Sequence, residues 1–235
     1  MTDTWAGKLF VIDGSDASGK ETQSTMAVAA LQAFGQATSY FDFPQYKTSD
    51  GGRLVGECLA GKWGDFVNLD PHIASFPYAW DRREARDAIR GALALGAVIC
   101  NRYVPSNLAH QGAKYTHWQS SEFGGEKITH FSATMKQIEY IQWLENLEYQ
   151  QLQLPKPDRV IYLYVPLEVS RALMADKAKD QHERNEQYLQ HVISLYSRLA
   201  RERDDWFIVN CAPNNVMRTR TDIHEEVMSI ICSLK

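Results

Sequence analysis

A glycine-rich turn near the start of the chain constrains the fold more than any other feature. Residues 11–23 read VIDGSDASGKETQ, which places Gly14, Gly19 and Lys20 in the pattern G-x-x-x-x-G-K between an apolar run and a helical segment. Glycines permit backbone angles that point successive N–H groups inward, and the start of the helix adds partial positive charge. The turn therefore predicts a buried strand, an anion-binding loop and a helix, in that order.

We call residues 14–22 the phosphate loop. Its members are Gly14, Ser15, Asp16, Ala17, Ser18, Gly19, Lys20, Glu21 and Thr22. We expect the ammonium group of Lys20 to face solvent and the β and γ phosphates of a nucleotide rather than the core. Glu21 stands where a hydroxyl normally reaches magnesium, so Thr22 and Asp16 with water remain alternative metal ligands. The ordinary alternative is a glycine-rich turn with an exposed lysine.

Apolar runs alternate with helical patterns along the rest of the chain. Five short runs predict buried strands, at 8–12, 38–43, 97–101, 159–165 and 206–210. Helices are predicted at 20–34, 72–95, 131–150, 167–178, 185–203 and 221–234. This order implies parallel strands joined by right-handed crossovers in a three-layer α/β sandwich. Ligands of such sheets bind at the carboxyl ends of the strands.

Length and composition narrow the class of protein. A chain of 235 residues predicts a single domain, 1–235. Its 25 Lys and Arg against 29 Asp and Glu give a net charge of −4, which argues against a nucleic acid polymer or a membrane as partner. No apolar window suits a signal peptide or a membrane span, so we expect a cytoplasmic protein. Four scattered cysteines suit reduced thiols rather than a zinc site.

Five further stretches together resemble the thymidylate kinase family, in the family's order. They are DFPQY (42–46), YAWDRR (78–83), NRYVPSNLAHQGAK (101–114), LPKPDRVIYLYV (154–165) and KDQHERNEQYL (179–189). The resemblance implies a P-loop NTPase fold of the nucleoside monophosphate kinase type, with a five-stranded parallel sheet flanked by helices. It also implies transfer of the ATP γ-phosphoryl group to thymidine monophosphate (dTMP), with ATP and Mg²⁺ as cofactors. A homodimer is implied as well, with helix 72–95 as its expected seam.

The resemblance assigns roles around the acceptor nucleotide. Arg102 would grip the acceptor phosphate, and Arg82 would hydrogen-bond a thymine carbonyl. Tyr78, one helical turn before Arg82, would stack on the ring. Asp16 is expected to act in catalysis, in binding of both nucleotides and at the metal. The alternative for Tyr78 is a tyrosine of the core, and the alternative for Arg82 is an arginine on the solvated face of a helix.

The stretch after the third predicted strand would complete the binding pocket for the acceptor nucleotide. Asn107 would read the N3 edge of the base, Ser106 and Gln111 would line the pocket, and His110 would lie near the sugar. Phe43 and Pro44 would form an apolar wall. Singly, His110 would be an ordinary partly buried histidine and Phe43 a core aromatic residue. A cluster of polar residues following the carboxyl end of one strand favours the site.

A basic segment at about 171–185 resembles the lid of the family. Lys179 and Arg184 would contact the transferred phosphoryl group, because Ala17 leaves the phosphate loop without an arginine. Glu183 would contact magnesium through water. Closure of a lid excludes water that competes with the acceptor. The alternative is a solvated linker.

Two departures from the family pattern bear on activity. Asn101 replaces an aspartate, and Asp42 stands near the usual place of an arginine. Loss of one catalytic interaction costs about 10²- to 10³-fold in rate, so we expect an active but slower enzyme.

Three hypotheses stay open: a dTMP kinase, a kinase for another nucleotide or deoxynucleoside, and a decayed nucleotide-binding module. The first requires Lys20 and Arg102 to face each other across one cleft. Residues 115–130 are expected to form a surface insertion.

Overall fold

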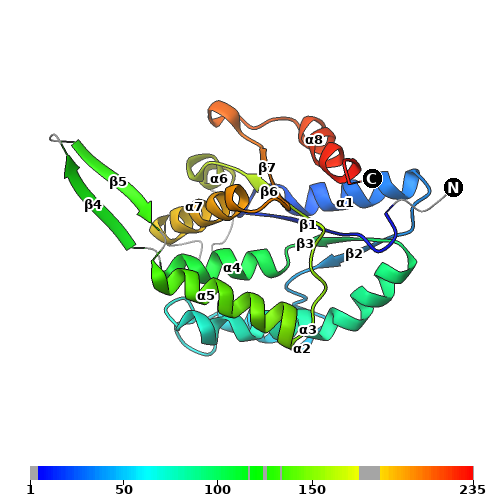
Figure 1. Cartoon of the computed structure of the whole chain (residues 1–235), viewed down its shortest axis with the longest axis horizontal. Coiled ribbons are helices and arrows are strands. Elements are labelled where there is room, and N and C mark those ends of the chain that lie inside the picture. Colours follow the sequence, from blue (N-terminus) through cyan, green and yellow to red (C-terminus); the bar gives the residue numbers. More distant parts are fainter. Residues whose placement is uncertain (1–4, 116, 124–125, 133, 175–185, 235) are drawn as a thin grey trace.

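A five-stranded parallel sheet forms the centre of the molecule (Figure 1). The computed structural model describes residues 5–115, 117–123, 126–132, 134–174 and 186–234, and for 117–123 and 126–132 it describes the backbone alone. The strands are β1 (Leu9–Gly14), β2 (Thr38–Asp42), β3 (Ala97–Asn101), β6 (Arg159–Tyr164) and β7 (Trp206–Asn210). Their order in the sheet is β2-β3-β1-β6-β7, and every neighbouring pair is parallel. All five predicted strands and the predicted fold class are confirmed.

The helices agree with the sequence pattern to within two residues at 20–34, 72–95, 185–203 and 221–234, but the helix predicted at 167–178 ends at Leu173. They are α1 (Lys20–Ala33), α2 (Asp50–Leu59), α3 (Pro71–Leu95), α4 (Val104–Gly112), α5 (Met135–Glu145), α6 (Leu167–Leu173), α7 (Glu186–Glu202) and α8 (Arg220–Cys232). The helix predicted at 131–150 was wrong at both ends, because it begins only at Met135 and turns into a π-helical segment at Asn146–Gln151. Helices α2 and α4 were not predicted.

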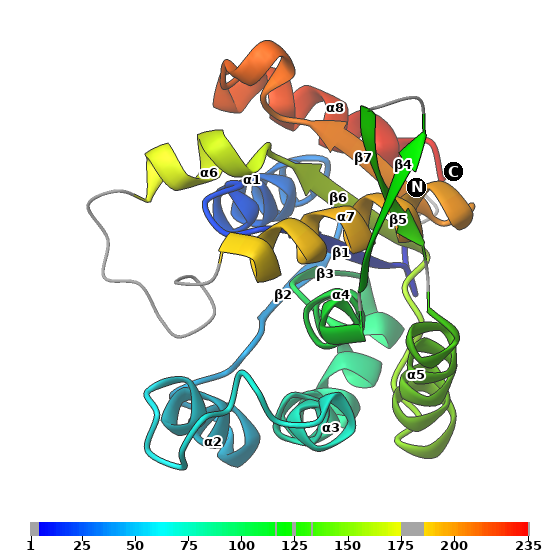
Figure 2. The same cartoon turned by 90° about the vertical axis from the view of Figure 1, so that its left-hand side faces the viewer.

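The sheet is covered by helices on both faces, because its strands alternate apolar side chains between two cores. In β1, Leu9 and Val11 pack with residues of α3, α4, α5 and α7. Phe10 and Ile12 point the other way and pack with residues of α1 and α8. Figure 2 shows α1 and α8 on one side of the sheet and α3, α4 and α5 on the other. The molecule is therefore a three-layer α/β/α sandwich.

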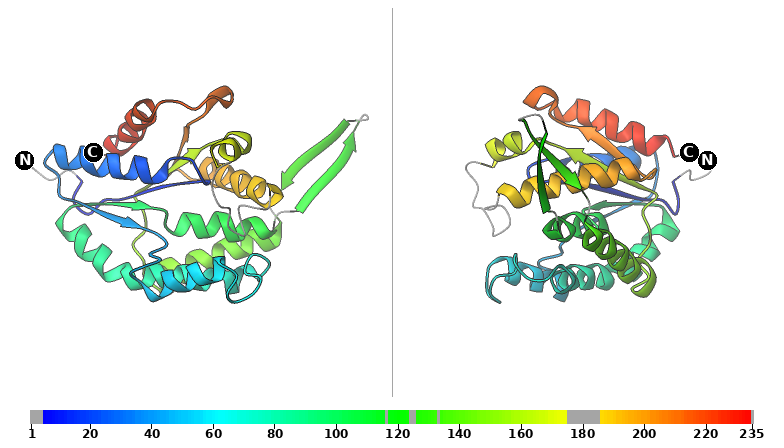
Figure 3. Two further views of the ribbon diagram at one scale, coloured as in Figure 1. Left: turned by 180° about the vertical axis from the view of Figure 1, so that it is seen from behind. Right: turned by 60° about the vertical axis from the view of Figure 1, so that its left-hand side comes forward.

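An antiparallel hairpin projects from one end of the molecule (Figures 1 and 3). It is formed by β4 (His117–Phe123) and β5 (Glu126–Ser132), whose backbones pair from His117 with Ser132 to Phe123 with Glu126. The described residues of the segment expected to form a surface insertion, 115–130, belong to this arm, except Tyr115, which ends a 3-10 turn at Ala113–Tyr115. That the segment is an insertion stays a prediction. Among the described helices, none has the length and apolar character needed to traverse a bilayer.

The fold brings the ends of three strands together. Ile12 in β1 and Asp42 in β2 are both in register with Asn101 in β3. Because parallel strands share one direction, their carboxyl ends open on the same edge of the sheet. The phosphate loop leaves β1 at this edge, beside the turn from β3 into α4.

We expect Gly96→Ala to destabilise the protein by about 1–3 kcal/mol, because no space exists for a side chain there. Gly96 is buried where α3 meets β3, and a Cβ atom would collide with the backbone oxygen of Ala37. Gly91 is the matched control, since it lies exposed in α3 with no atom near its virtual Cβ. Gly91→Ala should stabilise by about 0.5–1 kcal/mol. Urea unfolding measures both, and equal effects would contradict the packing described here.

Candidate active site

The phosphate loop has the geometry of an anion cradle. A Cβ atom on Gly14 would lie 2.6 Å from the backbone oxygen of Leu163 and 2.8 Å from Ser18 Oγ. Gly19 precedes α1 with a φ of 84°, a backbone conformation that favours glycine. The buried hydroxyls of Ser15 and Ser18 have no hydrogen-bond partner within the described part of the chain. These unpaired groups and the start of α1 suit the phosphates of ATP.

Lys20 folds back over its own loop. Its Nζ atom donates a hydrogen bond to the backbone oxygen of Ser15 at 2.6 Å and lies 3.9 Å from Asp16 Oδ1. The expectation that Lys20 faces solvent was wrong, because its side chain is only 9% exposed. Burial, with the positive charge of Arg102, lowers the pKa of Lys20 to about 8, although Asp16 partly opposes the shift.

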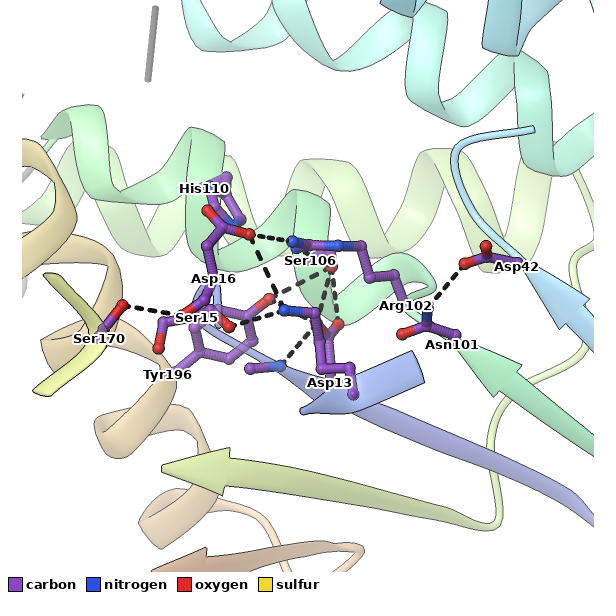
Figure 4. Close-up of polar contacts among 12 residues, drawn as sticks. Asp13, Ser15, Asp16, Asp42, Asn101, Arg102, Ser106, His110, Ser170 and Tyr196 are labelled. Atoms are coloured by element: carbon purple, nitrogen blue, oxygen red, sulfur yellow. Dashed lines mark hydrogen bonds and ion pairs between the residues drawn. The ribbon is translucent and has the colours of Figure 1, made fainter. Parts of the chain in front are cut away.

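Asp16 joins the phosphate loop to the end of β3. Its Oδ1 atom accepts a hydrogen bond from Arg102 Nη2 at 2.5 Å (Figure 4). Burial alone would raise the pKa of Asp16, but Arg102 and Lys20 hold it well below its usual range. Lys20 and Arg102 therefore approach the same carboxylate, one from the phosphate loop and one from the end of β3. A cleft shared by the two cations stays a prediction.

Arg102 has an unusual backbone. Its φ angle is 60°, which is uncommon for a residue other than glycine and costs about 1–3 kcal/mol. Such conformations cluster at active sites, where the surrounding structure holds them. Here the Arg102 backbone N–H donates to the oxygen of Ile12, which ties the turn to β1.

A buried carboxylate behind Arg102 was missed by the sequence analysis. Asp13 is fully buried and accepts hydrogen bonds from Ser106 Oγ at 2.8 and 2.9 Å and from Tyr196 Oη at 2.9 Å (Figure 4). It thereby fixes α4 and α7 beside the phosphate loop. Ser170 of α6 was also missed, and its hydroxyl donates to the backbone oxygen of Asp16 at 2.8 Å. The sequence did contain a signal for Asp13, because a charged residue stands there between an apolar run and the first glycine of the loop.

A cavity of about 210 Å³ opens beside Arg102, and we call it the acceptor pocket. Every residue expected to contact the acceptor nucleotide lines it. These residues are Asp16, Phe43, Pro44, Tyr78, Arg82, Arg102, Ser106, Asn107, His110 and Gln111. Tyr46 and Leu59 also line it and were not predicted. The hydroxyl of Ser106 is engaged by Asp13, so this residue borders the pocket with its hydrogen bonds already made.

Arg82 is buried rather than solvated. Its Nε and Nη2 atoms donate to the two carboxylate oxygens of Glu148, each at 2.6 Å. Asn107 Nδ2 donates to the same carboxylate at 3.0 Å. Glu148 was not predicted, because nothing in its local sequence distinguishes it from a surface glutamate of a helix.

The two departures from the family pattern contact each other. Asn101 Nδ2 donates to Asp42 Oδ1 at 2.8 Å across the β2–β3 pair (Figure 4). Burial raises the pKa of Asp42 and Glu21 adds to the shift, whereas the Asn101 hydrogen bond opposes it. An aspartate at position 101 would place a second carboxylate against Asp42. The two changes therefore form a single hydrogen-bonded pair.

The residues around the loop fit a magnesium ion held mainly by phosphate oxygens and water. Among the residues that the structure describes, no three His, Cys, Asp or Glu side chains cluster as a metal site. Mg²⁺ beside a nucleotide typically takes one or two carboxylates, phosphate oxygens and waters, and Asp16 is a carboxylate of this kind. Lys179, Glu183 and Arg184 of the expected lid lie outside the described residues.

Comparison with known proteins agrees with this geometry. A sequence profile of the thymidylate kinase family matches residues 12–122. Thymidylate kinase from Mycobacterium tuberculosis is 30% identical over 200 residues, which cover 82% of this chain and 85% of that protein. Human thymidylate kinase is 25% identical over 225 residues, which cover 94% of this chain and 88% of that protein. The structure of thymidylate kinase from Candida albicans has the same fold, with a TM-score of 0.70, 22% identity and coverage of 97% and 92%. The chain belongs to the thymidylate kinase family, whose known activity is phosphorylation of dTMP by ATP with Mg²⁺.

Proposed function

We propose that this chain transfers the γ-phosphoryl group of ATP to dTMP across the cleft that Asp16 spans. The contact that carries the proposal is the shared carboxylate, since Asp16 lies 3.9 Å from Lys20 Nζ and 2.5 Å from Arg102 Nη2. Phosphoryl transfer asks the protein chiefly to align two nucleotides and to neutralise charge. Two cations that approach one carboxylate support that role.

On the donor side, the phosphate loop would bind ATP through its backbone N–H groups and the hydroxyls of Ser15 and Ser18. Lys20 would leave Ser15 and hydrogen-bond the β and γ phosphates. Magnesium, when bound, neutralises phosphate charge, and Asp16 with water would hold it beside the loop. The proposal that Thr22 replaces the missing hydroxyl at position 21 rests on its adjacent place in the loop.

On the acceptor side, Arg102 would bind the phosphate of dTMP with its guanidinium fork. Tyr78, Phe43 and Pro44 would contact the base, and His110 would lie near the sugar. All four line the acceptor pocket. Arg102 is then the group that brings the acceptor oxygen into line with the γ phosphate. Lys179 and Arg184 remain proposed lid residues.

Asp42 favours a second candidate, a kinase for another nucleotide or deoxynucleoside. Its carboxylate occupies a place where an arginine was expected for the acceptor phosphate, and burial raises its pKa. A decayed module is less well supported, because Asn101 makes a defined hydrogen bond to Asp42 rather than leaving a gap.

We expect ADP to form only when ATP, Mg²⁺ and dTMP are all present. A coupled assay of ADP release across the pyrimidine monophosphates tests this. Lys20→Ala should lower kcat by about 10²-fold or more, because it removes the cation from the donor phosphates. Lys62→Ala is the control, since Lys62 is exposed and pairs with Glu57 on the surface. Equal phosphorylation of UMP would refute the role of His110 near the sugar, and an active Lys20→Ala would refute that of the phosphate loop.

The lowered pKa of Lys20 predicts that ATP binding takes up a proton. Free Lys20 has a pKa of about 8, and bound phosphates favour its charged form and so raise that pKa. Affinity should be highest below pH 8 and fall by at most about tenfold per pH unit above it. Calorimetry at pH 8.5 in two buffers of different ionisation heat measures the uptake. Lys20→Ala should show none, and identical uptake in both proteins would contradict the assignment.

We propose that the protein pairs with a second copy through α3. Ile73, Phe76 and Trp80 are exposed on this helix at spacings of three and four residues, so they form one apolar stripe. Sedimentation equilibrium should find a dimer at micromolar concentration. Phe76→Glu should shift it to monomer, whereas Leu95→Glu, at the far end of α3, should not. A wild-type monomer would refute the proposal.

A further inference from the structure

Glu148 is a fully buried carboxylate that the proposed chemistry does not use. It lies in the π-helical segment Asn146–Gln151, which follows α5. The wide turn is closed by a hydrogen bond from the Leu152 N–H to the oxygen of Leu147 at 2.8 Å. Short π-helical segments within helices are frequent at functional sites. A buried carboxylate is stable only when it is paired and hydrogen-bonded, so its partners indicate its role.

Both partners of Glu148 line the acceptor pocket. Arg82 donates from Nε to Oε2 and from Nη2 to Oε1, each at 2.6 Å, which is a bidentate ion pair. Asn107 donates from Nδ2 to Oε1 at 3.0 Å. One side chain thus holds two pocket residues that come from different helices, α3 and α4.

The hydrogen bonds of Asn107 determine which way its amide points. Besides Glu148, Nδ2 donates to the backbone oxygen of Ser75 at 3.2 Å. A backbone oxygen and a carboxylate oxygen can only accept, so the amide nitrogen must face them. The opposite orientation would place Oδ1 against two acceptors. Oδ1 is consequently left as a buried acceptor with no partner among the described residues.

Arg82 is oriented by the same carboxylate. Glu148 engages Nε and Nη2, and Nη1 takes no part in that pair. Arg82 and Asn107 both line the pocket, so guanidinium N–H donors and a buried amide acceptor belong to the same wall. A bound base would meet both a donor and an acceptor.

We propose that Glu148 is a positioning residue that selects acceptor bases with an N3–H group and a 4-carbonyl, through Asn107 and Arg82. This inference rests on the proposed function of the acceptor pocket. Thymine and uracil present N3–H to Asn107 and an oxygen to Arg82. Cytosine presents a lone pair at N3 and an amino group at C4, so both contacts would be repulsive. Sites with fixed buried polar groups discriminate strongly because a mismatch leaves those groups unpaired.

The test compares dTMP with dCMP in Glu148→Gln. A glutamine at 148 leaves the Ser75 oxygen as the one acceptor that still fixes the Asn107 amide, and it removes the negative charge that holds Arg82. Both pocket residues are then held less firmly. We expect the dTMP to dCMP ratio of kcat/KM, and of Kd by calorimetry, to fall at least tenfold. The KM for dTMP should rise more than kcat falls, because Glu148 touches neither phosphate. Glu145→Gln is the control: Glu145 lies one turn earlier in α5 and pairs with Arg203 outside the pocket, so the ratio should not change.

A second variant guards against misfolding of the first. Glu148→Asp keeps the buried charge beside Arg82 but shortens its reach toward Asn107, and it should also lower the ratio. A folded variant of either kind with the wild-type ratio would overturn the inference, as would a wild-type protein that binds dCMP as tightly as dTMP. Failure of the proposed function is distinct, since the wild type would then bind dTMP selectively without releasing ADP.

Discussion

The ion pair between Asp16 and Arg102 is the interaction on which the site depends. Without it, a buried lysine and a buried arginine would lie near each other with no carboxylate between them, and each would disfavour the charge of the other. Asp16 lets both cations remain charged close to where phosphates bind. Removal of one member of such a set is costly because it leaves an unpaired buried charge. The hydrogen bond from the Arg102 N–H to Ile12 and the hydrogen bonds that converge on Asp13 keep this geometry in place, despite the positive φ of Arg102.

The sheet was predictable from sequence because each strand is a short apolar run between helical patterns. The same reasoning failed where local preference and tertiary structure disagree. Helix α2 contains Gly51, Gly52 and Gly56, which disfavour a helix locally. Gly51 is nonetheless required, because a Cβ atom there would meet the backbone of Asp81 in α3. The helical conformation of this segment is determined by its close packing against α3, and no local sequence pattern predicts that packing.

The acceptor pocket was predictable through the family resemblance, and the residues that support it were not. Asp13 and Tyr196 meet across 183 residues of sequence, and Arg82 and Glu148 across 66. No spacing rule connects such pairs, because chain folding alone brings them together. The burial of Lys20 was mispredicted for a related reason: its partner, the Ser15 oxygen, is a backbone atom that side-chain patterns do not describe. The roles of Lys179, Glu183 and Arg184 stay predictions, since these residues lie outside the described part of the chain.

The hydrogen bond between Asn101 and Asp42 has a consequence for how such sequences diverge. Taken one position at a time, each residue counts as a loss: one carboxylate fewer near the metal and one cation fewer near the acceptor. In space they are adjacent, and the amide of one satisfies the carboxylate of the other. Restoring aspartate at 101 alone would set two acids side by side, and restoring arginine at 42 alone would leave the amide without its acceptor. The two positions are coupled through one hydrogen bond, so the effect of a change at either position depends on the residue at the other.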